Sequence, residues 1–311
     1  MKSVLHRCIQ LLLVMVGIVG SFAAQAAYEF TNIDPPGATF TEVFGINNSG
    51  QVVGGSQIGT VNILFLYDSK KGSFTTLPPA AGPTGLLGIS ESGVMVGSSN
   101  DGTFESGLIR SKKGVYTSFS HPDCDNTFGR AISNTGMVSG FANDCSASDF
   151  VGFIYDPVSN LYIDFLPSPR TIAQGINNRG QVVGNVQLGG GVACGICPAG
   201  HYGFLRASGG AITYFRVNNS GTSPRGITDS GLITGFFFDS ISGASQGFVA
   251  MLTGLPYEPI TIAPAQFLEV PGAVSTLPEG INDLGQIVGL WNDALGQQHG
   301  FIATPVPPKK K

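Results

Sequence analysis

The chain carries little charge for its length. Charged residues make up 12% of its 311 residues, about half the share found in an ordinary globular protein. The 16 basic residues are outnumbered by 20 acidic ones, a balance that argues against nucleic-acid binding, which needs a basic face. The 45 glycines follow no G-X-Y period, which excludes collagen, and the many Val, Ile and Phe residues exclude disorder. What remains is a glycine-rich, turn-rich, all-β protein.

Long hydrophobic runs are missing except near the N-terminus. Lys2 and Arg7 precede the apolar stretch 11–19, and Ala24-Gln25-Ala26 follows it as a small-x-small cleavage site. This order is typical of a secretory signal peptide, which we predict over residues 1–27. The stretch is about half the ~20 residues that cross a bilayer, so we favour cleavage over a retained anchor helix. We therefore expect a secreted protein, extracellular or periplasmic, without stable membrane insertion.

Motifs of known catalytic chemistry are also missing. The histidines beyond the signal peptide, His121, His201 and His299, fit neither HExxH nor another metal-ligand spacing. The sequence has no GxSxG elbow, Walker loop or Asp-box, and no GxGxxG between a strand and a helix. We therefore predict no cofactor and no metal centre and assign no catalytic residue, although acid–base catalysis by carboxylates stays open.

In place of such motifs, the chain has a ten-residue repeat in six copies. GINNSGQVVG at 45–54 returns at 88–97, 131–140, 175–184, 226–235 and 280–289, with starts separated by 43, 43, 44, 51 and 54 residues. Each copy reads as a short β run, a tight turn and a second β run. Asn, Asp or Ser suits the turn, and Gly takes its positive-φ position.

Two more β runs follow each copy, so each unit predicts a four-stranded meander. A period of 40 to 55 residues with four strands is typical of a β-propeller blade. The last unit stops after its third strand, and Tyr28–Ile33 resembles the fourth strand that precedes that unit. We therefore predict that residues 28–305 form a six-bladed β-propeller, closed by the N-terminal strand, because a linear array would leave two raw sheet edges. The expected blades are 41–77, 84–119, 127–166, 171–216, 222–270, and 276–302 with 28–33, before a tail at 306–311.

The repeat resembles that of the bacterial extracellular HAF-repeat family. Its GIN-x-x-G-Q-V-V-G core and the H-A-F-L-Y-like strand that follows carry the resemblance over nearly all of the mature chain. Only His299-Gly300-Phe301 keeps the histidine of the second half. Many members are exported, and some end in a sorting tail with an apolar helix. This chain ends in prolines and three lysines, so we expect a released protein. The resemblance implies no established activity.

Four cysteines remain after the signal peptide, an even number that indicates two disulfides in an exported chain. Three pairings exist on paper. We favour Cys124–Cys145, because both fall in loops that a propeller places side by side on one face. Cys194–Cys197 would then staple a long glycine-rich loop; a C-x-x-C zinc half-site is the lower-ranked alternative because no second pair exists.

The face opposite the short GINNSG-type turns carries the variation in loop length and is the better place for a ligand. Four Asp residues recur there, and aromatic side chains fall near the same loops. The candidate ligand-binding residues are Asp101, Asp144, Asp239, Trp291, Asn292, Asp293 and Tyr202. Asx turns and blade packing explain such residues as well as binding of sugar hydroxyls or Ca²⁺ does.

The residue before the first-strand glycine is expected to line the central channel. Polar examples are Arg130, Gln174, Arg225 and Glu279. They are either filler or an anion site, and we favour filler. The leading functional prediction is a monomeric, non-enzymatic propeller that binds an extracellular glycan or protein through its variable loops. A polysaccharide hydrolase or lyase with carboxylates at the channel mouth, and a structural matrix protein, are the alternatives.

Overall fold

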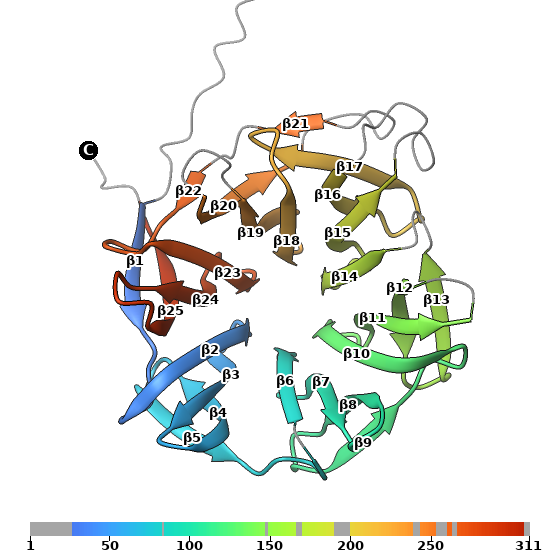
Figure 1. The fold of residues 1–311 in the computed structure, drawn as a ribbon, viewed down its shortest axis with the longest axis horizontal. Coiled ribbons are helices and arrows are strands. Elements are labelled where there is room, and N and C mark those ends of the chain that lie inside the picture. The colour runs from blue at the N-terminus through green and yellow to red at the C-terminus, as the bar shows by residue number, and fades with distance from the viewer. Residues whose placement is uncertain are drawn as a thin grey trace, which may run out of the picture.

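Each copy of the repeat forms the two inner strands of one antiparallel sheet. The computed structural model describes residues 27–82, 84–146, 149–165, 170–189, 200–238, 243–252, 260–262 and 266–307. Six sheets are arranged radially around a central axis in these residues, which confirms the predicted β-propeller (Figure 1). Within the same ranges, no helix is long and apolar enough to cross a membrane.

The first three blades follow the predicted four-strand order from the axis outward. Blade 1 consists of β2 (Ala38–Ile46), β3 (Gln51–Ile58), β4 (Val61–Asp68) and β5 (Ser73–Leu77). Blade 2 consists of β6 (Thr84–Ile89), β7 (Met95–Asn100), β8 (Glu105–Arg110) and β9 (Tyr116–Phe119). Blade 3 consists of β10 (Cys124–Ile132), β11 (Val138–Cys145), β12 (Phe150–Asp156) and β13 (Leu161–Phe165).

The next two blades are linked by a strand that the repeat does not predict. Blade 4 consists of β14 (Thr171–Ile176), β15 (Val182–Leu188), β16 (Gly200–Arg206) and β17 (Ile212–Val217). Blade 5 consists of β18 (Thr222–Ile227), β19 (Leu232–Phe238), β20 (Ser245–Met251) and β22 (Gln266–Leu268). The added strand, β21 (Ile260–Ile262), leaves blade 5 and pairs in parallel with β17, the outer strand of blade 4.

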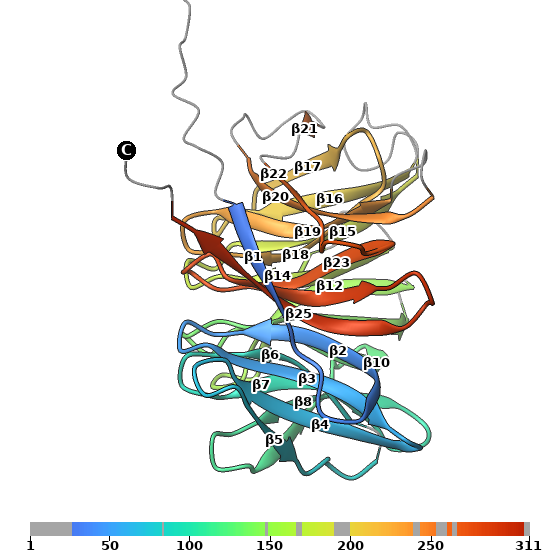
Figure 2. The same cartoon turned by 90° about the vertical axis from the view of Figure 1, so that its left-hand side faces the viewer.

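Blade 6 joins the two ends of the described chain. It consists of β23 (Ser275–Ile281), β24 (Ile287–Asn292), β25 (Gln298–Val306) and the N-terminal β1 (Ala27–Asn32). β1 pairs antiparallel with β25 from Ala27 opposite Val306 to Asn32 opposite Phe301, and the two strands lie together at the side of the ring (Figure 2). The N-terminal strand therefore closes the ring as predicted, because it supplies the fourth strand of the last blade.

The glycine that ends each repeat makes room for the core of its blade. The third-strand residue beside it is Phe in five blades and Leu in one, and none of the six is more than 3% exposed; these residues are Phe65, Leu108, Phe153, Phe204, Phe248 and Phe301. At Gly140 an added Cβ would lie 2.7 Å from the Phe153 ring. Burial of each such side chain contributes about 2–3 kcal/mol to folding, which is why these glycines recur.

Candidate functional site

A β-bulge in the first strand of each blade aims one side chain at the axis. The strand register shifts at the residue before the first residue of each repeat, which is glycine in five blades and Ala131 in blade 3. A bulge turns a side chain out of the regular alternation of a strand. The six residues line a hollow of about 90 Å³ on the variable face; they are Phe44, Leu87, Arg130, Gln174, Arg225 and Glu279. All four polar residues predicted for the channel are among them.

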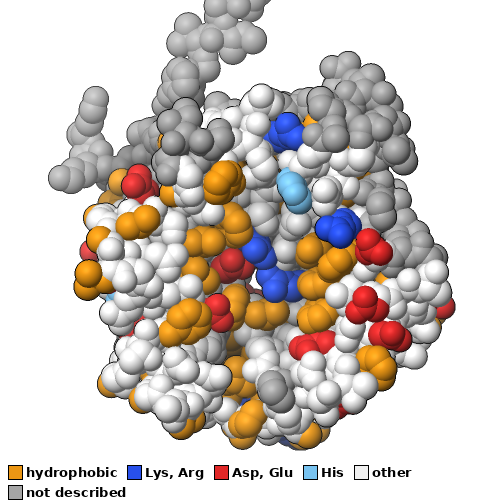
Figure 3. Space-filling model, viewed as in Figure 1, with side chains coloured by type: hydrophobic (Ala, Val, Ile, Leu, Met, Phe, Trp, Pro, Cys, Tyr) orange, Lys and Arg blue, Asp and Glu red, His pale blue; other side chains and the backbone are white. Residues whose placement is uncertain are grey.

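The polar residues form one connected network. Glu279 is buried, with 8% of its side chain exposed, and its Oε2 lies 3.5 Å from Arg225 Nε and 3.8 Å from Arg130 Nη2. Arg130 Nε donates to Gln174 Oε1 at 2.7 Å. Gln174 Nε2 in turn donates to Asn185 Oδ1 at 3.1 Å. Basic side chains are visible at this central hollow, with acidic and apolar ones around them (Figure 3).

Burial in the ring shifts the pKa of Arg130 in the network and that of the neighbouring Glu42. Desolvation, reinforced by the Arg225 guanidinium, lowers the pKa of Arg130 to about 10, while Glu279 and Glu42 oppose the change. Desolvation raises the pKa of the Glu42 carboxyl, with a smaller contribution from Glu279 in the same direction. Arg130 and Arg225 therefore have few carboxylates near them to balance their charges. An oxyanion at the channel mouth would be attracted to the two guanidinium groups.

The channel is divided along its length by six isoleucines. The hollow described above and a second one of about 60 Å³ on the opposite face are both lined by Ile46, Ile89, Ile132, Ile176, Ile227 and Ile281. This isoleucine collar separates the charged mouth from the turns of the repeats. A ligand on the variable face would therefore contact the mouth and the loops around it.

A larger cleft lies between blades 4 and 5 on the same face. Its volume is about 450 Å³, and it is lined by Asn185, His201, Arg216, Gly221, Thr222, Ser223 and Phe238. Phe238 is 54% exposed, so its ring presents an accessible apolar surface. Asn185 of the cleft contacts the channel network, because its Oδ1 accepts from Gln174 Nε2 as well as from Ser223 Oγ at 3.4 Å. A hydrogen bond therefore links the lining of the cleft to the channel mouth, and together they are the candidate surface.

Asp101 and Asp144 accept hydrogen bonds from groups of their own blades. Asp101 Oδ1 accepts the backbone N–H groups of Thr103 and Phe104 at 2.8 and 2.9 Å, and these bonds lower the pKa of its carboxyl. Asp144 has a positive φ of 56° and accepts from Asn126 Nδ2 at 2.7 Å. Asp239 lies outside the described residues. In the part of the chain that the structure describes, no three His, Cys, Asp or Glu side chains are grouped to hold a metal ion.

Trp291, Asn292 and Asp293 make contacts within blade 6. The Trp291 ring stacks on His299 at 4.6 Å between centroids, and its Nε1 donates to Asn32 Oδ1 at 3.2 Å. Asn292 Nδ2 donates to Ser275 Oγ at 2.8 Å. Asp293 Oδ1 accepts from the backbone of Leu295 and Gln297, both at 2.8 Å, and these bonds lower the pKa of its carboxyl. His299 therefore covers one face of the Trp291 ring, and a ligand could stack only on the other.

Tyr202 is a core residue, which corrects its place among the ligand-binding candidates. It is 3% exposed, and the Arg216 guanidinium carbon lies 4.0 Å from the centre of its ring. The residue at this position of the third strand differs from copy to copy of the repeat, so the sequence did not indicate that Tyr202 is buried. The residues that do line the cleft come from strand ends where the copies differ most, so the repeat pattern did not single them out.

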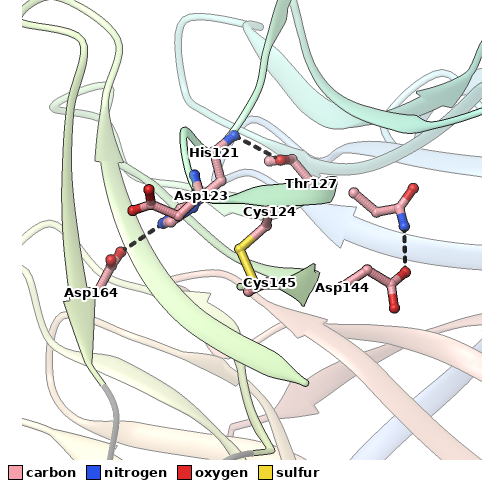
Figure 4. The surroundings of a disulfide bond; sticks show 8 residues. His121, Asp123, Cys124, Thr127, Asp144, Cys145 and Asp164 are labelled. Carbon is pink, nitrogen blue, oxygen red and sulfur yellow. Dashed lines mark hydrogen bonds and ion pairs between the residues drawn. A yellow bond between two sulfur atoms is a disulfide. The ribbon is translucent and has the colours of Figure 1, made fainter. Parts of the chain in front are cut away.

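The structure confirms the Cys124–Cys145 disulfide. The two residues lie opposite each other at the end of the β10–β11 ladder, with Cα atoms 3.9 Å apart (Figure 4). His121 is buried beside the bond and contacts Asp164 Oδ1 through Nε2 at 3.1 Å. The disulfide therefore fixes the variable-face end of blade 3. Cys194 and Cys197 lie outside the described residues.

The repeat turns carry a hydrogen-bonded ring that turn chemistry alone did not predict. The fourth residue of each repeat accepts the N–H of the same residue in the preceding blade, at 2.6 to 2.8 Å around the whole circle. The last of these bonds runs from Asp283 N–H to Asn48 Oδ1 and closes the circle. A signal was present, since all six residues have a side-chain acceptor: Asn48, Glu91, Asn134, Asn178, Asp229 and Asp283.

Comparison with known proteins identifies the β-propeller fold but no family or function. No protein-family model matches the sequence, and no characterised protein is similar enough in sequence to count as a relative. A luciferin-regenerating enzyme shares the fold with a TM-score of 0.56 at 11% identity, over 90% of this chain and 96% of that one. A catalytically inactive virginiamycin B lyase from Staphylococcus aureus, solved with quinupristin, has a TM-score of 0.50 at 14% identity, over 90% and 100% of the two chains. These neighbours include enzymes, so the β-propeller by itself decides neither for catalysis nor for binding.

Proposed function

We propose that this protein is a secreted, non-enzymatic β-propeller that binds a glycan through its variable face. The observation that carries the proposal is the blade 4–5 cleft, whose lining residue Asn185 is hydrogen-bonded to Gln174 of the charged channel mouth. The export part rests on the predicted signal peptide and agrees with the Cys124–Cys145 disulfide. We also propose membership of the HAF-repeat family on the strength of the six repeats.

The cleft has the size and chemistry of a small-ligand site. A volume of about 450 Å³ lies within the usual range for such sites, and a concave site suits a sugar unit better than a flat protein surface. Phe238 offers an exposed ring for stacking, while Asn185 and Ser223 offer amide and hydroxyl groups for sugar hydroxyls.

Charge at the centre of the face favours an acidic sugar. Arg216 lines the cleft, and Arg130 and Arg225 line the channel mouth, with Glu279 as the carboxylate between the last two. Guanidinium groups bind carboxylates with paired hydrogen bonds. A chain containing uronic acid would place a neutral ring face on Phe238 and a carboxylate toward the arginines.

A glycan array of neutral and uronate-containing oligosaccharides, followed by calorimetry, tests the proposal. Phe238→Ala should weaken binding of the best glycan about tenfold, which corresponds to about 1.4 kcal/mol. Phe267→Ala is the matched control, because Phe267 is 50% exposed in the same blade and lies outside the cleft lining. Absence of glycan binding, or equal losses in the two variants, would contradict the proposal.

A polysaccharide hydrolase or lyase is the second candidate, favoured by one pair of carboxyls. In this candidate the Glu42 carboxyl, whose pKa is raised by desolvation, is the proton donor, and Glu279, which lies beside Arg130 and Arg225, is the second carboxylate. Incubation with the bound glycans should release new reducing or unsaturated ends if this candidate is right. Glu42→Gln and Glu279→Gln should then each abolish product formation, whereas binding alone gives no product.

A further inference from the structure

A wide surface hollow lies away from the variable face, between the turns of blades 1 and 2. Its volume is about 600 Å³, and its charged lining consists of Asp68, Lys70, Lys71, Glu91, Arg110 and Lys112. We call it the lysine groove. The four lysines within the described ranges stand at 70, 71, 112 and 113, and three of them line this groove. Basic charge is therefore concentrated here in a chain with a net charge of −4.

The acidic residues of the groove are already engaged. Asp68 Oδ2 lies 2.9 Å from Lys71 Nζ, and its Oδ1 accepts the backbone N–H of Lys70 at 3.1 Å. Glu91 Oε1 accepts the Asn48 N–H at 2.6 Å in the ring of repeat turns. No carboxylate among the described residues lies within ion-pair distance of the exposed Lys70 and Lys112. Their charges face the groove without counter-charges from the protein.

Arg110 adds a third cation that is fixed in place. Its side chain lines the groove, it is only 9% exposed, and its guanidinium lies 5.7 Å from the centre of the Tyr116 ring. Its buried Nε has no hydrogen-bond acceptor. A guanidinium held by packing loses little conformational freedom when it binds an oxyanion. Arg110 therefore adds a preorganised positive charge to the groove that the exposed Lys70 and Lys112 also line.

We propose that the lysine groove binds an anionic polysaccharide through its carboxylate or sulfate groups. Lys70 and Lys112 lie on the β4–β5 and β8–β9 turns of neighbouring blades, so a linear chain in the groove meets a cation on each side. Ser49, Gln51 and Ser92 add hydroxyl and amide groups to the lining, which suits sugar hydroxyls. The groove lies on the face opposite the proposed cleft, so this site is additional to it.

Calorimetry of the full mature chain with a heparin hexasaccharide and with an oligogalacturonate tests this site. Maltohexaose, polyglutamate and anionic phosphatidylglycerol vesicles are the comparison probes. We expect binding of at least one anionic oligosaccharide, weakened by added salt because exposed charges are screened over about 10 Å at 0.1 M. Maltohexaose should not bind. Equal or tighter binding of polyglutamate or of vesicles would overturn the assignment to a polysaccharide.

The chain offers a matched pair of variants. Lys70→Ala and Lys112→Ala should each weaken binding up to about fivefold, since an exposed ion pair contributes at most about 1 kcal/mol, and the double variant more than tenfold. Lys113→Ala removes the same charge one residue away, outside the groove lining, and should leave the affinity within about twofold. Equal losses in Lys112→Ala and Lys113→Ala, or no binding at all, would overturn the proposal. Phe238→Ala should leave groove binding unchanged, so failure of one site is distinguishable from failure of the other.

Discussion

Replacing Asn282 with serine should weaken the seam between the last and first blades. Asn282 is buried, and its Nδ2 donates across the seam to the carbonyl oxygen of Asn47 at 3.0 Å. Its Oδ1 holds its own turn by accepting the Gln286 N–H at 2.9 Å. Blades 2, 3 and 5 have a serine or threonine at this position, and there the hydroxyl accepts the same backbone N–H. Asn282→Ser should therefore keep the turn and lose the bond across the seam.

The magnitude follows from one buried hydrogen bond. An intramolecular hydrogen bond contributes about 1 kcal/mol net, and the unpaired partners and smaller side chain bring the expected loss to about 1–2 kcal/mol. The Asn47 carbonyl keeps a second donor, the Gly50 N–H at 3.0 Å, which limits the penalty. For a chain of this size, the unfolding midpoint should fall by about 3–6 °C. Asn282→Ala removes the turn bond as well and should cost about 1 kcal/mol more.

Urea unfolding and hydrogen exchange measure the two consequences. Asn47→Ser is the matched control, because Asn47 Nδ2 makes the equivalent bond, 3.1 Å to the Ser90 carbonyl, between blades that the chain already connects. Both variants should lose similar free energy of unfolding. Only Asn282→Ser should speed exchange of amides in β1 and β25, which close the ring. An unfolding free energy unchanged within about 0.3 kcal/mol, or faster exchange in both variants alike, would refute this reasoning.

Three further changes test other parts of the ring. The double variant Cys124→Ser, Cys145→Ser removes a disulfide between residues 21 positions apart and should lower the free energy of unfolding by about 3 kcal/mol, measured with denaturant. Dithiothreitol should cause the same loss in the wild type and no such loss in the variant. Glu42→Gln should raise the unfolding temperature at pH 7 and have little effect below pH 4.5, the ordinary pKa of this carboxyl. Because the pKa of Glu42 is raised in the folded protein, the wild type loses stability as the pH rises through that pKa, and the variant does not. A gain in unfolding temperature that did not grow with pH would count against this prediction. Glu279→Gln leaves Arg130 and Arg225 without their carboxylate and should cost about 3 kcal/mol in urea unfolding, so a neutral or stabilising effect would show that the network is dispensable.

The sequence predicted the ring because its repeat is local. Turn glycines such as Gly50, with a φ of 80°, and the close packing of Phe65 on Gly54 act within one blade, so each copy of the repeat specifies its own sheet. Closure by the N-terminal strand was also predictable, since the last unit lacked a strand that residues 28–33 resemble. The strand β21 was not, because a segment of blade 5 pairs with blade 4 and no copy of the repeat contains it.

The candidate site was predictable only where it follows the repeat. Arg130, Gln174, Arg225 and Glu279 occupy the same position in four copies, and the bulges bring all four to the axis. The loop candidates instead proved to hold turns, as with Asp101, or to lie in the core, as with Tyr202. Loop side chains follow no period, so their neighbours depend on how adjacent blades pack.

What the sequence determined by itself is therefore the blade and its number, because strand alternation, turn glycines and period are properties of consecutive residues. What only the tertiary structure decided is which residues from different blades meet. Asn185 joins a cleft to the channel, and Lys70 and Lys112 face one groove although 42 positions separate them. Such contacts between blades depend on the distance and angle between neighbouring blades. Side-chain packing around the whole closed ring determines both.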